Sequence, residues 1–125
     1  MASTAHRRIQ IVDDNDDLLI SLSGILREAG HEVRTAEDGT AAIALARSWK
    51  PEFVLLDVQM PGMNGFEIAK QLRAMFPPGA MKLVLMSGSS LDETALRSAE
   101  RAGFDHYIDK VQGFAMLEKL LSNHA

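Results

Sequence analysis

The sequence contains no cysteine, and this absence excludes disulfide bonds, thiol catalysis and thiolate metal ligands. It holds 13 Lys and Arg residues against 17 Asp and Glu residues, without a cluster of basic side chains. A nucleic-acid surface needs such a cluster, so we expect no direct contact with nucleic acid. The sequence also lacks a signal peptide and any apolar run near the roughly 20 residues that span a bilayer. We therefore expect a soluble, cytoplasmic protein without membrane contact.

The length and composition are those of one ordinary globular domain. The chain has 125 residues, of which 46% are hydrophobic and 24% are charged. The first six residues are short and polar, and we expect residues 1–6 to form a poorly ordered N-terminal extension. Residues 7–125 are then expected to form a single domain, with no room for a second one.

Five short apolar runs alternate with five segments of helical period, which is typical of a parallel sheet covered on both faces. The second run is the least apolar, so we expect it at a sheet edge. We predict an α/β fold, a five-stranded parallel sheet in the order 2-1-3-4-5 with helices on both faces, in a flavodoxin-like three-layer sandwich. The predicted strands are Arg8–Val12, His31–Thr35, Phe53–Leu56, Leu83–Met86 and Phe104–Ile108.

Each predicted helix has an apolar stripe. The first is capped by Asn15 and stopped by Gly30, and the fourth begins at a capping box of Ser90 with Glu93 and ends at Gly103. The fifth runs over residues 113–123. The stripes are Leu18, Leu22, Ile25, Leu26 and Ala29; Ala42, Leu45 and Trp49; Ile68, Leu72 and Met75; Ala95, Ala99 and Ala102; and Leu117, Leu120 and Leu121.

Polar side chains follow four of the predicted strands. Asp13 and Asp14 follow the first and Asp57 follows the third, with Ser87 and Lys110 after the fourth and fifth. The carboxyl ends of parallel strands share one edge, so the three acids form a cluster if the first and third strands are neighbours, about 4.8 Å apart. Three carboxylates that close repel one another unless a cation relieves them. Carboxylate ligands without His or Cys suit magnesium.

Plainer interpretations of the same residues stay open at this point. Asp13 and Asp14 read equally well as a solvated helix cap, and Lys110 and Ser87 as a surface lysine and a turn serine. Asp57 is harder to explain in this way, because a carboxylate at the end of a buried strand is costly without a partner. A Ser-His-Asp hydrolase is not supported, because no His stands at a strand end and no Gly-x-Ser-x-Gly motif is present.

Four segments in order resemble the receiver domains of bacterial response regulators and hybrid sensor kinases, over essentially the whole chain. Each lies at a predicted strand end, and the combination is highly specific although each segment alone is weak. The segments are Ile11-Val12-Asp13-Asp14-Asn15, Leu56-Asp57-Val58-Gln59-Met60-Pro61-Gly62-Met63-Asn64-Gly65, Met86-Ser87-Gly88, and Ala102-Gly103-Phe104-Asp105-His106-Tyr107-Ile108-Asp109-Lys110.

The resemblance implies a phosphoacceptor domain of a two-component or phosphorelay system. It makes Asp57 the residue that takes a phosphoryl group from a phosphohistidine on a sensor histidine kinase or a histidine phosphotransfer protein. Mg²⁺ is the implied cofactor, bound directly by Asp14 and Asp57, with the Gln59 carbonyl as a further ligand and Asp13 acting largely through water. The domain is then a signalling module and not an enzyme, although it assists its own phosphorylation and dephosphorylation.

The resemblance also implies a conformational switch. Ser87 and Lys110 would contact the phosphoryl oxygens, and Tyr107 would move inward when Ser87 shifts. The fourth helix, fifth strand and fifth helix would bind the downstream protein partner. The sequence departs from the family in one place, because Val111 follows Lys110 where a proline is usual; we expect a trans peptide there. Gln59 and Ser89 flank the path of water to the phosphoaspartate and are expected to tune its lifetime.

Three other classes of protein share parts of this pattern. A haloacid dehalogenase-like phosphatase or phosphotransferase also uses an aspartyl phosphate, but Gln59 stands where its second aspartate would be, and a cap domain is missing. A flavodoxin-like flavin protein would need a first loop rich in Ser, Thr and Gly. A receiver-like interaction domain that is never phosphorylated is disfavoured by the full set of site residues. A stand-alone regulator and a receiver cut from a larger protein both remain open, although the segments Asp13-Asp14-Asn15 and Gly103-Phe104-Asp105-His106 resemble hybrid-kinase receivers.

Overall fold

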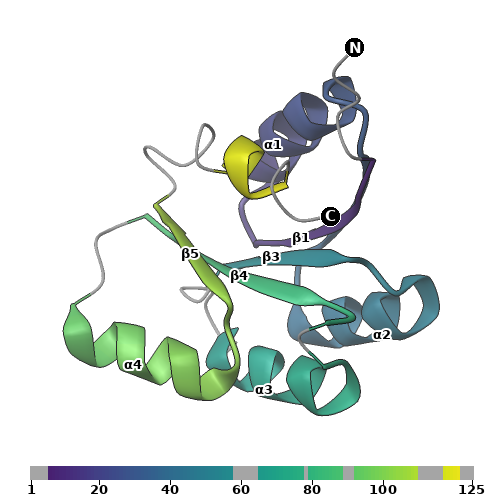
Figure 1. Ribbon diagram of the computed structural model, residues 1–125. Coiled ribbons are helices and arrows are strands. Elements are labelled where there is room, and N and C mark those ends of the chain that lie inside the picture. The colour runs from purple at the N-terminus through teal and green to yellow at the C-terminus, as the bar shows by residue number, and fades with distance from the viewer. Residues whose placement is uncertain (1–5, 58–64, 78, 89–91, 110–116, 122–125) are drawn as a thin grey trace.

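The computed structural model of the chain contains a five-stranded parallel sheet between two layers of helices (Figure 1). The strand order is β2-β1-β3-β4-β5, and all neighbouring pairs are parallel, which confirms the predicted fold. The structure describes residues 6–57, 65–77, 79–88, 92–109 and 117–121. The expected N-terminal extension therefore lies outside the described residues except for His6.

The strands fall close to the predicted runs. They are β1 (Arg8–Val12), β2 (Glu32–Ala36), β3 (Phe53–Asp57), β4 (Lys82–Ser87) and β5 (His106–Asp109). β1 has the predicted bounds, and β2 is the predicted edge strand. β5 begins later than expected because Phe104 still belongs to the preceding helix end, where its N–H donates to the Ala99 carbonyl over 3.1 Å.

Four helices have described bounds: α1 (Asp16–Glu28), α2 (Gly39–Trp49), α3 (Gly65–Met75) and α4 (Glu93–Ala102). Residues 117–121 are also helical, within the predicted fifth helix, whose ends at 113 and 123 lie outside the described residues. Among the described helices, none has the length and apolar character needed to cross a membrane.

Two details of the predicted helices are wrong. The buried face of α1 is centred on Leu19, Leu22 and Leu26, so Ile25, predicted to face the core, is 37% exposed. The capping box at Ser90 does not begin α4. Asp92 caps that helix instead, because its carboxylate accepts the Ala95 N–H over 2.8 Å. Asp92 is also closer along the chain than Ser90 to the buried stripe of the helix.

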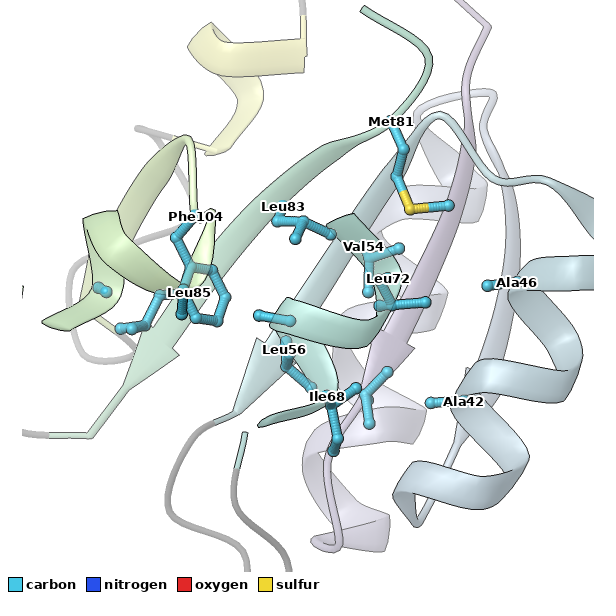
Figure 2. Close-up of a cluster of buried hydrophobic side chains, with 14 of the residues drawn as sticks. Ala42, Ala46, Val54, Leu56, Ile68, Leu72, Met81, Leu83, Leu85 and Phe104 are labelled. Atoms are coloured by element: carbon cyan, nitrogen blue, oxygen red, sulfur yellow. The ribbon is translucent and has the colours of Figure 1, made fainter. Parts of the chain in front are cut away.

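Apolar side chains fill both faces of the sheet because successive residues of each strand point to opposite sides. Val54 and Leu56 belong to the core under α2, α3 and α4, which Figure 2 shows. Phe53 and Leu55 belong to a second core under α1 and residues 117–121. Every residue of β3, including Asp57 at its end, is therefore buried.

A buried polar network joins the amino end of the sheet to the last helix. The Arg7 guanidinium donates to the Leu121 carbonyl over 3.3 Å and to the Glu52 carboxylate over 3.5 Å. The Arg7 backbone N–H donates to the His31 ring nitrogen Nδ1 over 3.1 Å, which requires that nitrogen to be unprotonated. Burial, with the nearby charges of His6 and Arg7, lowers the pKa of His31, while Glu52 opposes this shift.

We predict that His31 destabilises the protein in acid. Its folded pKa lies below the unfolded value of about 6.5, so the unfolded chain takes up the proton first as the pH falls below that value. His31→Asn keeps an acceptor without a titrating group. Thermal melts should therefore show that the wild type loses stability relative to His31→Asn between about pH 7.5 and 5.5.

His6 provides a control of opposite sign. Its hydrogen bonds to the Glu32 carboxylate and the Gly30 carbonyl raise its pKa. His6 therefore stabilises the folded protein below about pH 6.5, and this stabilisation is lost as the pH rises through its folded pKa. A wild type and His31→Asn pair that melt in parallel over this range would contradict the assigned role of His31.

Candidate functional site

Three carboxylates converge at the carboxyl edge of the sheet. One oxygen each from Asp13, Asp14 and Asp57 lies within 4.8 Å of the others. Asp13 is 0% and Asp57 3% exposed, whereas Asp14 is exposed to solvent. The structure thus brings together residues that are far apart in the sequence, as their places after β1 and β3 predicted.

Strand pairing and a tight turn position these three side chains. β1 and β3 are neighbours, and Val12 lies opposite Leu56, so Asp13 and Asp57 come side by side at the strand ends. Asp13 Oδ1 accepts the Asn15 N–H over 3.0 Å, and the Asn15 side chain in turn caps α1 by accepting the Leu18 N–H over 3.2 Å. The predicted cap is confirmed, and the turn into α1 begins at the cluster itself.

Ser87 and Tyr107 extend the same region across the neighbouring strands. Asp57 lies opposite Met86, so Ser87, which is fully buried, ends β4 one residue further along. Tyr107 lies in β5 opposite Leu85 and is half-buried against the core under α3 and α4. Because side chains alternate along β4, Ser87 points to the same face of the sheet as Leu85, which is also the face of Tyr107.

Four predicted features lie outside the described residues. These are the Gln59 carbonyl, Ser89, Lys110, and the peptide bond between Lys110 and Val111. Their predicted roles therefore stay predictions.

The sequence reasoning missed the acidic pair Glu37 and Asp16 near the end of β1. Glu37 follows β2, whose last carbonyl, that of Ala36, accepts the Asp13 N–H over 3.2 Å. A hydrogen bond with the Asp16 carboxyl, together with the charges of Asp16 and Asp38, raises the pKa of Glu37. The sequence signal was weaker, because Glu37 stands two residues beyond Thr35, the predicted end of its strand, whereas Asp13 and Asp57 directly follow the predicted ends of theirs.

The chemistry of the donor set fits a hard divalent cation. The cluster offers only carboxylate oxygens, two of them on buried side chains held by strand ends, and the third open to water. Magnesium prefers oxygen ligands, uses one or two carboxylates and keeps several waters. Asp13, Asp14 and Asp57 can therefore hold such an ion, and its charge would relieve their mutual repulsion.

Comparison with known proteins decides the family. The sequence model described as the response regulator receiver domain matches residues 9–122. The chain belongs to this family. Receiver domains are signalling modules of two-component systems.

Curated relatives agree with this membership. The receiver domain is 37% identical over 103 residues to protein PilH of Pseudomonas aeruginosa, covering 82% of this chain and 84% of PilH. It is 34% identical over 107 residues to the DNA-binding response regulator MtrA of Mycobacterium tuberculosis, covering 86% of this chain but 45% of MtrA. The chain therefore spans most of one relative and less than half of the other.

Solved structures share the fold. The chemotaxis protein CheY4 of Vibrio cholerae superposes with a TM-score of 0.83 at 26% identity, covering 93% of this chain and 97% of CheY4. The response regulator TrrA of Thermotoga maritima, solved in complex with Mg²⁺ and BeF, superposes with a TM-score of 0.80 at 32% identity. That alignment covers 92% of this chain and 96% of TrrA.

We predict that neutralising one acid of the cluster stabilises the metal-free protein. Asp14→Asn removes one of three neighbouring charges without emptying any core space, and the gain should be on the order of 1 kcal/mol. Thermal melts in a chelator should show a raised midpoint. Added magnesium should then raise the midpoint of the wild type more than that of Asp14→Asn.

Asp17→Asn is the matched control, because Asp17 is also exposed and lies in the first turn of α1. It should not stabilise the metal-free protein, since an acid there favours the helix amino end. Equal midpoints for Asp14→Asn and wild type in the chelator would show that the cluster carries no strain from repulsion.

Proposed function

We propose that Asp57 is the phosphoacceptor of this receiver domain and takes a phosphoryl group from a phosphohistidine on a partner protein. The convergence of Asp13, Asp14 and Asp57 at one edge of the sheet carries this proposal. Family membership supports it, because receiver domains work with phosphodonor partners such as histidine kinases. The domain is proposed to span residues 7–125.

The reaction needs a fixed nucleophile more than covalent assistance. An Asp57 carboxylate oxygen forms the new bond to phosphorus as the bond between phosphorus and the partner's histidine nitrogen breaks, and the imidazole leaves with that electron pair. Asp57 is 3% exposed and ends a fully buried strand, so its side chain is held in place before the partner arrives. Positioning of this kind supplies much of the catalysis in phosphoryl transfer.

Charge neutralisation is the second requirement. A bound magnesium ion would supply positive charge to the phosphoryl oxygens as they transfer. Asp14 and Asp57 are proposed as its direct ligands, with the Gln59 carbonyl as another and Asp13 acting largely through water. Lys110 is proposed to contact the phosphoryl oxygens as well.

Ser87 and Tyr107 are proposed to convert this modification into a change of surface. A phosphoryl group adds about −1.5 to −2 charges and strong acceptor oxygens, to which the Ser87 hydroxyl can donate. Tyr107 shares the face of the sheet to which Ser87 points, and a few kcal/mol of difference in contacts suffices to shift such a pair between two states. The changed surface comprises α4, β5 and the fifth helix, where we place the downstream protein partner.

A small acyl phosphate tests whether Asp57 is the acceptor. Incubation with a small acyl phosphate and magnesium should add about 80 Da to the wild type, the mass of one phosphoryl group, in an intact-mass measurement. Neither Asp57→Asn nor the wild type in a chelator should gain it. Asp17→Asn is the matched control and should be labelled like the wild type.

Equal labelling of Asp57→Asn would remove the proposed site. No labelling of any variant, with the metal bound, would favour a receiver-like interaction domain that is not phosphorylated.

Tyr107 is the only tyrosine in the sequence, so a label on tyrosine reports directly on the proposed switch. Fluorotyrosine incorporated into the protein therefore gives a single fluorine NMR signal. Phosphodonor with magnesium should shift this signal in the wild type and leave it in place in Asp57→Asn. Ser87→Ala should accept phosphate but show a smaller shift, because the hydroxyl that follows the phosphate is missing.

A shift of the same size in phosphorylated Ser87→Ala would show that the response of Tyr107 does not depend on the Ser87 hydroxyl, and would contradict the proposed coupling.

A further inference from the structure

The Arg73 side chain joins α3 to the segments that precede β4 and β5. Its guanidinium donates to the Gly103 carbonyl from Nε over 3.1 Å and from Nη2 over 2.7 Å. Nη1 donates to the carbonyls of Phe76 over 3.2 Å and Met81 over 2.9 Å. Nη2 also forms an ion pair with the Asp105 carboxylate at 2.5 Å. We call this set of contacts the Arg73 clamp.

Asp105 connects the clamp to β4 of the sheet. The carboxylate oxygen that meets Arg73 also accepts the Leu83 N–H over 2.9 Å, and the Asp105 N–H donates to the Leu83 carbonyl over 2.8 Å. The side chains of Arg73 and Asp105 are 17% and 20% exposed, so water competes little with these charge-assisted bonds. The contacts therefore hold the carboxyl end of α4 against both α3 and β4.

Gly103 fits the clamp in two ways. It caps α4 in the left-handed conformation, with a φ of 105°, which favours glycine. A Cβ atom at this position would also lie 3.0 Å from the Cβ and Cγ atoms of Arg73. The stem of Arg73 therefore lies directly against the end of the helix.

The amino half of α4 is less buried than its carboxyl half. The buried residues of this helix are Ala99 and Ala102, both in its carboxyl half, whereas Glu93 and Thr94 are exposed. Figure 1 shows the carboxyl end of α4 next to α3, with which it packs, and its amino end projecting away. A cavity of about 190 Å³ lies between α4 and β5, lined by Leu96, Ala99, Glu100 and residues 104–107.

The less buried end of α4 is the end nearest in sequence to the site. Ser87 ends β4, Asp92 caps α4, and residues 88–91 connect them. A displacement of Ser87 would therefore act on the amino end of the helix, while the Arg73 clamp holds the other end. The cavity beside Leu96 and Tyr107 gives the helix and the ring space to move.

We propose that the Arg73 clamp is a fixed pivot, about which the amino half of α4 swings when Asp57 is phosphorylated. The trigger rests on the function proposed above, but the pivot is a property of the unmodified protein. Arg73 thereby sets how the helix moves, as a rotation about its carboxyl end and not as a shift of the whole helix.

The absence of cysteine makes the test direct, because any two introduced cysteines are unique sites for spin labels. Ser48→Cys on α2 serves as the reference, paired with either Thr94→Cys or Arg101→Cys, and all three positions are exposed. Pulsed electron paramagnetic resonance then gives a distance distribution for each end of α4. In the unmodified protein, the Arg101→Cys pair should give the narrower distribution.

Loss of the clamp should loosen the carboxyl end specifically. Arg73→Met should widen the distribution of the Arg101→Cys pair roughly twofold, because the anchoring bonds are gone. Asp105→Asn is the milder second variant and should widen it in the same direction if Arg73→Met fails to fold. Arg97→Met is the matched control, because Arg97 is an exposed arginine of α4 that pairs with Glu93 along the helix and has no other ion pair among the described residues, and it should leave the width unchanged.

Phosphodonor with magnesium should then shift the Thr94→Cys pair and leave the Arg101→Cys pair within its original width. Equal shifts of both pairs, or an unchanged width of the Arg101→Cys pair in the clamp variants, would overturn the pivot. Phosphate uptake is read from the mass of the same samples. If no phosphate is gained, the proposed function fails, while the widths in the unmodified protein still decide whether the clamp anchors the helix.

Discussion

The parallel pairing of β1 with β3 is the constraint on which the rest of the site depends. Because Val12 lies opposite Leu56, the next residues, Asp13 and Asp57, have to meet at the strand ends. Both side chains are buried, and Asp14 adds a third charge from the solvent side. Such a cluster costs stability in the absence of a cation, so the fold itself builds a place where positive charge is favourable.

The two faces of the sheet carry different parts of the structure. The core under α1 and residues 117–121 holds the strands in register, and the Arg7 network ties its far end to the last helix. The core under α2, α3 and α4 includes the half-buried Tyr107, and the buried residues of α4 there, Ala99 and Ala102, lie in its carboxyl half. The surface that is proposed to report the state of the site therefore lies on the second of these faces.

The sequence predicted the strands well because each is a short apolar run with a clear end. It predicted the cluster for the same reason, since polar residues after buried strands have to meet at one edge. It misplaced the start of α4 because Ser90 and Asp92 can both cap a helix, and only packing selects between them. It missed the Arg73 clamp because the partners of Arg73, Gly103 and Asp105, are distant in sequence and lie together only once the chain is folded.

The most direct test of the central claim is to map where a divalent cation binds. Manganese(II) has ligand preferences close to those of magnesium and broadens the NMR signals of nearby amide groups. At low manganese, the account predicts selective loss of the amide signals of Asp14, Asp57 and Ser87, while those of Arg8 and Glu32 at the opposite edge persist. Excess magnesium should restore the lost signals. Broadening that is uniform over the chain, or centred on another acidic group such as Glu93 and Glu100, would contradict a cation site built by the pairing of β1 and β3.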